Sequence, residues 1–164
     1  MPLIKNGAEI ANEWTFVPDG AVLREGGPEK GKVSVSLARF LGLKQGQENG
    51  PLPDGVRLGP ADTAEDLEPY LSELSLIEVD FPRYTDGRGY SQAQLLRRRY
   101  QYTGELRAVG HVLRDQIFYM HRSGFDAYVT RRAGLSEIVE ALKEYSVVYQ
   151  PAADTSPPAF RRRS

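Results

Sequence analysis

Two kinds of hydrophobic pattern alternate along the second part of the chain. Short, mostly apolar runs predict strands at 56–59, 76–81, 106–110, 125–130 and 147–150. Between them, apolar residues recur every three or four positions and predict helices at 62–74, 91–102, 112–122 and 136–142. Strands that alternate with short helices are typical of a parallel sheet with right-handed crossovers. The pattern allows either an open sheet or a sheet that curls like half a β/α barrel.

The beginning of the chain has a pattern of strands and turns instead. Short strands are predicted at 3–5, 8–10, 14–17 and 33–37. Asn6-Gly7, between the first two strands, is the strongest short signal for a β-hairpin. Residues 38–43 either continue the last of these strands or form one helical turn.

The length of the chain, 164 residues, favours one domain with a core of its own. We expect a single α/β domain over residues 1–150, followed by a flexible tail at 151–164. Within the domain we expect a β-rich cap, an exposed connection rich in glycine and proline, and the β-α repeats, at 1–45, 46–55 and 56–150. The predicted fold class is therefore α/β, with repeated β-α units in a mainly parallel sheet and a small N-terminal β-hairpin cap.

The residue composition excludes several kinds of site. The chain has no cysteine, so disulfides, thiolate metal sites, iron–sulfur clusters and a cysteine nucleophile are excluded. With only two histidines, His111 and His121, a metal site with several histidine ligands is not expected either. No apolar run approaches the length of about 18 residues that a membrane helix needs, and the first residues lack the apolar region of a signal peptide. We therefore expect a cytoplasmic protein without a metal or other cofactor.

Charge is distributed unevenly along the chain. Residues 1–79 carry a net charge of −6, whereas residues 80–132 carry +5, entirely through arginine. Arginine recognises carboxylate, phosphate and sulfate-like oxyanions through two parallel hydrogen bonds. The alternative is a solvated surface whose arginines pair with acidic groups of the first half. A nucleic acid is not expected as partner, because the total charge is only −1 and the aromatic residues form no RNA-binding signature.

The predicted site lies where parallel strands end. Ligands of parallel α/β sheets bind at the carboxyl ends of the strands, and the loops there also open helices whose free N–H groups favour anions. These loops hold Arg83, Arg88, Arg131 and His111. The arginines are the candidates for anion binding, and His111 is a candidate for proton transfer.

The longest of these loops contains the most specific pattern. In residues 82–90, Asp86, Gly87, Gly89 and Tyr90 are expected to shape the loop, with positive φ angles at the two glycines. We expect Arg83, Asp86 and Arg88 to form one ordered cluster in which the two arginines clamp an oxyanion. In the alternative interpretation, the carboxylate only pins the arginines in place.

Two charged residues are expected beneath this loop. Asp80, at the end of a predicted strand, either orients an arginine or acts as a base. Arg107 lies inside the next strand, where it either binds an anion or pairs with Glu78 or Asp80 on the neighbouring strand. No P-loop, G-x-S-x-G or G-x-G-x-x-G motif is present, so the residues name no reaction.

The middle of the sequence resembles a bacterial family of unknown function, domain-of-unknown-function family 934. The resemblance extends over residues 33–132 and rests on the segments 81–91, 95–97, 104–110, 113–116 and 122–126. The family is often labelled an oxidoreductase, and its genes commonly lie beside assimilatory sulfite reductase. No catalytic residues are established for the family, so none can be assigned to this chain from the resemblance. At the position of His111 the family pattern has an acidic residue, which this chain lacks. The resemblance therefore implies a role in sulfate and sulfite assimilation, whereas no flavin, nicotinamide, haem or cluster motif supports the label.

These observations lead to three functional hypotheses. The first is a non-redox accessory protein of sulfite reduction that binds an anionic small molecule, or the sulfite reductase itself, through an arginine-rich edge. The second is a small enzyme that acts on a phosphorylated or sulfated metabolite, with Arg83, Arg88 and Arg131 on the anion and Asp80 or His111 moving a proton. The third is a structural module that forms a homo-oligomer.

Overall fold

One eight-stranded sheet organises the molecule. The structure is a computed structural model and describes residues 3–23, 32–129, 136–138 and 140. The strand order is β2-β1-β8-β7-β6-β5-β4-β3. The strands are β1 (Leu3–Lys5), β2 (Ala8–Ile10), β3 (Trp14–Phe16), β4 (Lys32–Ser36), β5 (Gly55–Leu58), β6 (Leu76–Phe81), β7 (Glu105–Gly110) and β8 (Ala127–Val129).

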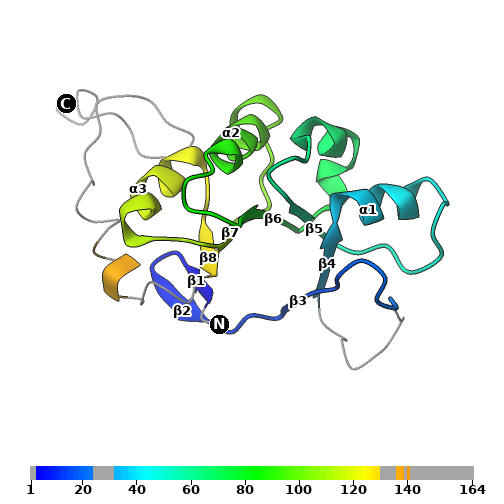
Figure 1. Cartoon of the computed structure of the whole chain (residues 1–164), viewed down its shortest axis with the longest axis horizontal. Helices are drawn as coiled ribbons and strands as arrows, with labels where there is room; N and C mark the ends of the chain where they lie inside the picture. The colour runs from blue at the N-terminus through cyan, green and yellow to red at the C-terminus, as the bar shows by residue number, and fades with distance from the viewer. Residues whose placement is uncertain (1–2, 24–31, 130–135, 139, 141–164) are drawn as a thin grey trace.

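The direction of the strands confirms the predicted fold class. Strands β3 to β8 are parallel, and the hairpin of β1 and β2 joins β8 in antiparallel fashion. The sheet curls like half a barrel, with the helices on its outer side (Figure 1). This curl decides between the two architectures that the sequence left open.

The residues predicted as one cap lie at both edges of this sheet. The β1–β2 hairpin is present, and Asn6 and Gly7 at its turn have the positive φ angles, 52° and 76°, that such a turn requires. Strands β3 and β4, however, extend the parallel sheet at the opposite edge. The short segment between β2 and β3 therefore runs across the open side of the half-barrel (Figure 1).

The helices of residues 37–123 pack on the outer face. They are α1 (Leu37–Lys44), the 3₁₀ helix η1 (Ala64–Glu73), α2 (Arg88–Gln94) with its π-helical continuation η2 (Leu95–Arg99), and α3 (Arg114–Ser123). Pro69 lies inside η1, where its missing N–H is less disruptive in a 3₁₀ segment than in a long α-helix. The helix α2 begins at Arg88, three residues before the predicted start at residue 91, so Ser91 lies within the helix.

The main core lies between the sheet and these helices. Every second strand residue points outward into this core, as Val56, Ile77 and Leu106 do, and all three are fully buried. The helices contribute residues such as Leu67 and Ile117 to the same cluster. Of the helix predicted at 136–142, residues 136–138 and 140 are described and are helical, and Ile138 is buried in the same cluster. The strand predicted at 147–150 and the tail at 151–164 lie outside the described residues.

None of the helices in the described part of the chain has the length and apolar character that crossing a membrane requires.

Candidate functional site

The inner face of the half-barrel carries charged residues where the outer face is apolar. Residues two apart on a strand share a face, so Glu78 and Asp80 of β6 lie on the inner face with Arg57 of β5 and Arg107 of β7. In the strand register, Glu78 lies directly between Arg57 and Arg107. The same alternation that builds the apolar core therefore places a row of alternating charges inside the curl.

Arg107 is the most deeply buried member of this row, with 1% exposure. Its guanidinium donates to Glu105 Oε1 over 2.8 Å from Nε and forms an ion pair with it over 2.6 Å from Nη2. It also donates to Asn12 Oδ1 over 3.0 Å and lies 3.7 Å from Glu78 Oε1. The pairing of Arg107 with Glu78 that the sequence predicted is present. Because Asn12 belongs to the segment between β2 and β3, Arg107 also ties this segment to the inner face.

Arg57 is held in one orientation, but not all of its hydrogen-bond donors have a partner among the described residues. Its Nε donates to Glu78 Oε2 over 2.7 Å, and its guanidinium stacks on the ring of Phe16 at 3.8 Å from the centroid. Glu78 also accepts a hydrogen bond from Ser34 and is itself buried, so it is a fixed anchor. Within the described part of the chain, neither terminal nitrogen of Arg57 has a hydrogen-bond partner. The side chain of Arg57 is 28% exposed, which leaves these nitrogens accessible.

Asp80 is the other incompletely satisfied group on this face. Its carboxylate is half-buried and accepts no hydrogen bond from any residue that the structure describes. Burial raises the pKa of Asp80 above its usual value, the Arg57 guanidinium lowers it, the Glu78 carboxylate raises it and His111 lowers it. Gly110 makes room for this carboxylate: its φ is +95°, and a Cβ there would lie 2.8 Å from Asp80 Oδ1.

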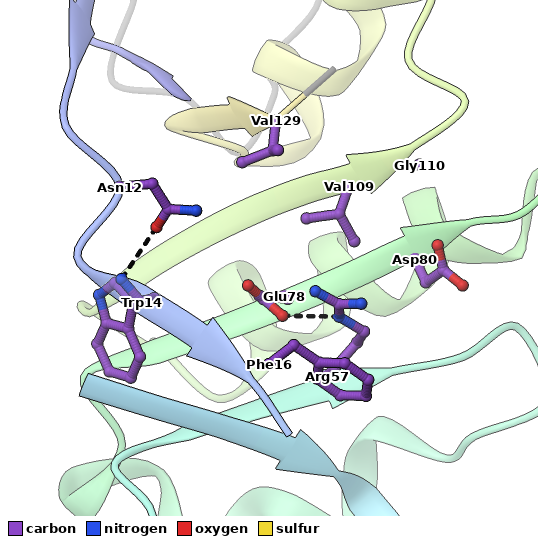
Figure 2. Close-up of a pocket in the computed structure, with 9 residues that line it drawn as sticks. All are labelled: Asn12, Trp14, Phe16, Arg57, Glu78, Asp80, Val109, Gly110 and Val129. Carbon is purple, nitrogen blue, oxygen red and sulfur yellow. Dashed lines mark hydrogen bonds and ion pairs between the residues drawn. The ribbon is translucent and has the colours of Figure 1, made fainter. Parts of the chain in front are cut away.

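These side chains surround a cleft of about 630 Å³. Arg57, Glu78 and Asp80 form its charged part (Figure 2). The remaining lining residues are Asn12, Trp14, Phe16, Val109, Gly110 and Val129. The volume is in the range of small-molecule sites. The cleft thus offers a guanidinium and a carboxyl group, with aromatic and aliphatic walls beside them.

The predicted arginine cluster is divided in the structure. Arg88 pairs with Asp86 over 2.6 Å on the exposed loop, and Arg83 is exposed. Among the described residues, no hydrogen bond or ion pair joins either arginine to Asp80 or Arg107. Arg88 instead pairs with Asp86, because this carboxylate lies only two residues away in the chain. Asp86 does shape the loop as expected, since its N–H also donates to the carbonyl of Arg83 over 3.2 Å, whereas the binding of an oxyanion by Arg83 and Arg88 stays a prediction.

The two glycines of this loop also differ from expectation. Gly87 has φ −86°, and Gly89 lies in α2 without a positive φ. Gly89 is required for another reason, since a Cβ there would lie 2.5 Å from the Phe81 ring. Tyr90 packs on the same ring, with 5.4 Å between centroids. These residues fix α2 against the end of β6 rather than forming a tight turn.

The remaining predicted residues have different positions. His111 lies at the end of β7, where its backbone N–H donates to the carbonyl of Phe81 over 2.7 Å, and its imidazole is near enough to influence Asp80. Arg131 lies outside the described residues. In the described ranges, no three histidine or carboxylate side chains gather as a metal site would require.

Sequence reasoning missed Arg57, Asn12 and the aromatic wall of Trp14 and Phe16. The alternation Val56-Arg57-Leu58 contained a usable signal, since a charged residue between two apolar ones in a strand points to the opposite face. No local signal identified Asn12, which reaches the site only because its segment crosses the open side of the sheet.

The comparisons with known proteins identify a family without a known activity. The sequence model of a family described as "Bacterial protein of unknown function (DUF934)" matches residues 55–160, more than half of the chain. This segment includes the four charged residues Arg57, Glu78, Asp80 and Arg107, whereas Asn12 precedes it. No curated protein and no solved structure matches the chain.

Proposed function

The chain belongs to the DUF934 family of bacterial proteins of unknown function, and we propose that it binds a small anionic metabolite in the inner cleft through Arg57. The observation that carries this proposal is the state of the Arg57 guanidinium. Glu78 and Phe16 hold it in one orientation, and its terminal nitrogens have no partner among the described residues. A guanidinium held in this way is suited to bidentate binding of an oxyanion.

The balance of charge around the cleft supports an anion. Three cations, Arg57, Arg107 and Lys5, contact only two carboxylates, Glu78 and Glu105. This connected group therefore has one excess positive charge. Asp80 also lines the cleft, and its carboxylate offsets part of this excess through its Coulomb interaction with Arg57.

The genes of this family commonly lie beside assimilatory sulfite reductase, and this association guides the choice of ligands to test. We propose an organic or inorganic oxyanion of sulfur assimilation, and the test is a thermal-shift titration with sulfate, sulfite, phosphate and adenylyl sulfate. A ligand at 100 times its Kd stabilises the folded state by about 2.7 kcal/mol, which such a titration detects.

The matched variants are Arg57→Gln and Arg88→Gln. Arg88 is an exposed arginine that already has its own carboxylate, Asp86, so it serves as control. Each variant is compared with its own ligand-free melting temperature, because loss of the Arg57–Glu78 pair lowers stability by itself. We expect wild type and Arg88→Gln to respond to the same anions and Arg57→Gln to lose the response. Equal responses of all three proteins would refute the role of Arg57.

The cleft also fits a small enzyme that acts on a phosphorylated or sulfated metabolite. The accessible carboxyl of Asp80 favours this second proposal, because it faces the cleft beside Arg57 and burial raises its pKa, which makes it a stronger base than an ordinary aspartate. Turnover of a ligand found in the titration, lost in Asp80→Asn while binding persists, would support it. Binding without turnover would leave the protein as an accessory binding protein.

The exposed loop supports a partner role in sulfite reduction. Arg83 and Tyr84 are exposed, while the Tyr84 carbonyl accepts a hydrogen bond from Gln116 of α3 over 2.5 Å. We propose that this ordered, basic and aromatic loop contacts the sulfite reductase. Co-purification of the tagged protein with the reductase, weakened in a double variant Arg83→Ala and Tyr84→Ala, is the expected result. Absence of association, together with normal growth of a deletion strain on sulfate, would exclude it.

A further inference from the structure

We infer that the cleft selects anions that carry a hydrogen-bond donor a few atoms from the oxyanion, and that Asp80 is the residue that makes this selection. The ligand class is an organic acid, sulfonate, phosphate or sulfate ester with a neighbouring amino or hydroxyl group. This inference rests on the proposed binding of the oxyanion by Arg57.

The strand register separates the two groups by a distance that suits such a ligand. Arg57 lies opposite Glu78, and Asp80 follows Glu78 by two residues on the same face. From the spacing of strands and residues, the Cα atoms of Arg57 and Asp80 are about 8 Å apart. Both side chains line the same cleft, so a ligand of a few atoms can contact both (Figure 2).

Asp80 differs from the other carboxylates of the inner face. Glu78 accepts from Ser34 and Arg57, and Glu105 accepts from Lys5 and Arg107. Asp80 has no donor among the residues that the structure describes, although it is half-buried and lies beside Gly110. A partly desolvated acceptor without a donor gains from a donor on the ligand, because its hydrogen bonds to water are reduced.

The same arrangement disfavours a bare inorganic anion. An oxyanion on Arg57 meets the negative potential of Asp80, whereas an amino or hydroxyl group on the ligand converts this repulsion into a hydrogen bond. Val109 and Val129 belong to the same row of the sheet as Asp80 and provide an apolar wall beside it. The cleft therefore favours a small organic backbone over a fully hydrated ion.

Matched pairs of probes test this selection by isothermal titration calorimetry. The pairs are 2-aminoethyl phosphate against ethyl phosphate, and 2-aminoethanesulfonate against ethanesulfonate, which differ in the amino group. For wild type we expect the amino compound to bind about tenfold more tightly or better, the effect of one hydrogen bond to a charged group. For Asp80→Asn we expect less than about a threefold difference. The control is Asp86→Asn, because the Asp86 carboxylate pairs with Arg88 and does not line the cleft, and this variant should keep the wild-type preference.

The outcomes separate this inference from the proposed function. If wild type binds both members of each pair equally, or if Asp80→Asn keeps the preference, anion binding stands and the selection by Asp80 is refuted. If no member of either pair binds to wild type while an anion of the thermal-shift titration does, the selection by Asp80 is refuted and the site at Arg57 stands; if none of these anions binds, both are refuted. Loss of all binding in Arg57→Gln, with loss of only the preference in Asp80→Asn, supports both.

Discussion

Replacing Arg107 by alanine tests whether the charged inner face is part of what holds the fold together. Arg107 has 1% exposure and contacts Glu78, Glu105 and Asn12. Removal of one partner from a buried ion pair destabilises a protein by about 3–5 kcal/mol, because the other charge is left without compensation. In Arg107→Ala, Glu78 still forms its ion pair with Arg57, and Glu105 still forms its ion pair with Lys5. Because neither carboxylate is left without a cation, we expect a loss at the lower end of this range, about 3 kcal/mol.

Urea denaturation followed by circular dichroism measures this loss. With a slope of about 2 kcal/mol per molar urea, the midpoint of Arg107→Ala should lie about 1.5 M below that of wild type. A domain with 5–15 kcal/mol of stability remains folded in water after such a loss, so the transition stays measurable. The control is Arg88→Ala, which removes the pair of the exposed Arg88 side chain with Asp86 and should leave the midpoint close to that of wild type.

The comparison can contradict the reasoning in two ways. Equal midpoints for wild type and both variants would mean that the row of charges on the inner face contributes little to stability. A larger loss in Arg88→Ala than in Arg107→Ala would mean that the exposed loop, and not the inner face, is the organised charged cluster.

Four further predictions concern single residues. Burial raises the pKa of Asp80 above its unfolded value of 3.8, so the stability that this group contributes is complete below pH 3.8 and is lost as the pH rises through its folded pKa. Asp80→Asn should remove this loss in melting curves recorded from pH 3.8 upward, and an unchanged profile would contradict the burial of this carboxyl group. The Arg88 guanidinium lowers the pKa of Asp86 to about 2, so the contribution of this carboxylate to stability is present above pH 3.8 and is lost as the pH falls towards 2. Asp86→Asn should abolish this acid dependence in melting curves, and an unchanged profile would contradict the pairing. Gly110→Ala should lower stability by about 1–3 kcal/mol in urea denaturation, because its φ of +95° is strained for alanine and a Cβ would lie 2.6 Å from the carbonyl oxygen of Phe81. A Gly110→Ala variant as stable as wild type would contradict this, since the end of β7 could then adopt another backbone conformation. Gly89→Ala should lower stability by about 1–3 kcal/mol through overpacking against the Phe81 ring, whereas Gly87→Ala, with open space around it, is the matched control.

Local sequence determined the elements of this protein and their order. Apolar runs of strand length and helical spacing depend only on neighbouring residues, which is why β5, β6, β7 and α3 lie close to their predicted positions. The turn at Asn6-Gly7 is equally local. The pair of Arg107 and Glu78 could also be predicted, because consecutive strands joined by a short helix are usually neighbours in a parallel sheet.

Tertiary structure alone decided which residues form the site. The curl of the sheet turns one face of every strand inward, and no local pattern states which face this is or that Arg57 and Asp80 meet there. Asn12, Trp14 and Phe16 reach the cleft because the chain crosses from one edge of the sheet to the other, a pairing between distant residues. The arginines of the loop at 82–90 behave differently, because their contacts are local. Arg88 finds its partner two residues away in Asp86, so a dense local charge is neutralised on the surface, while the isolated charges within apolar strands are those that the fold brings together.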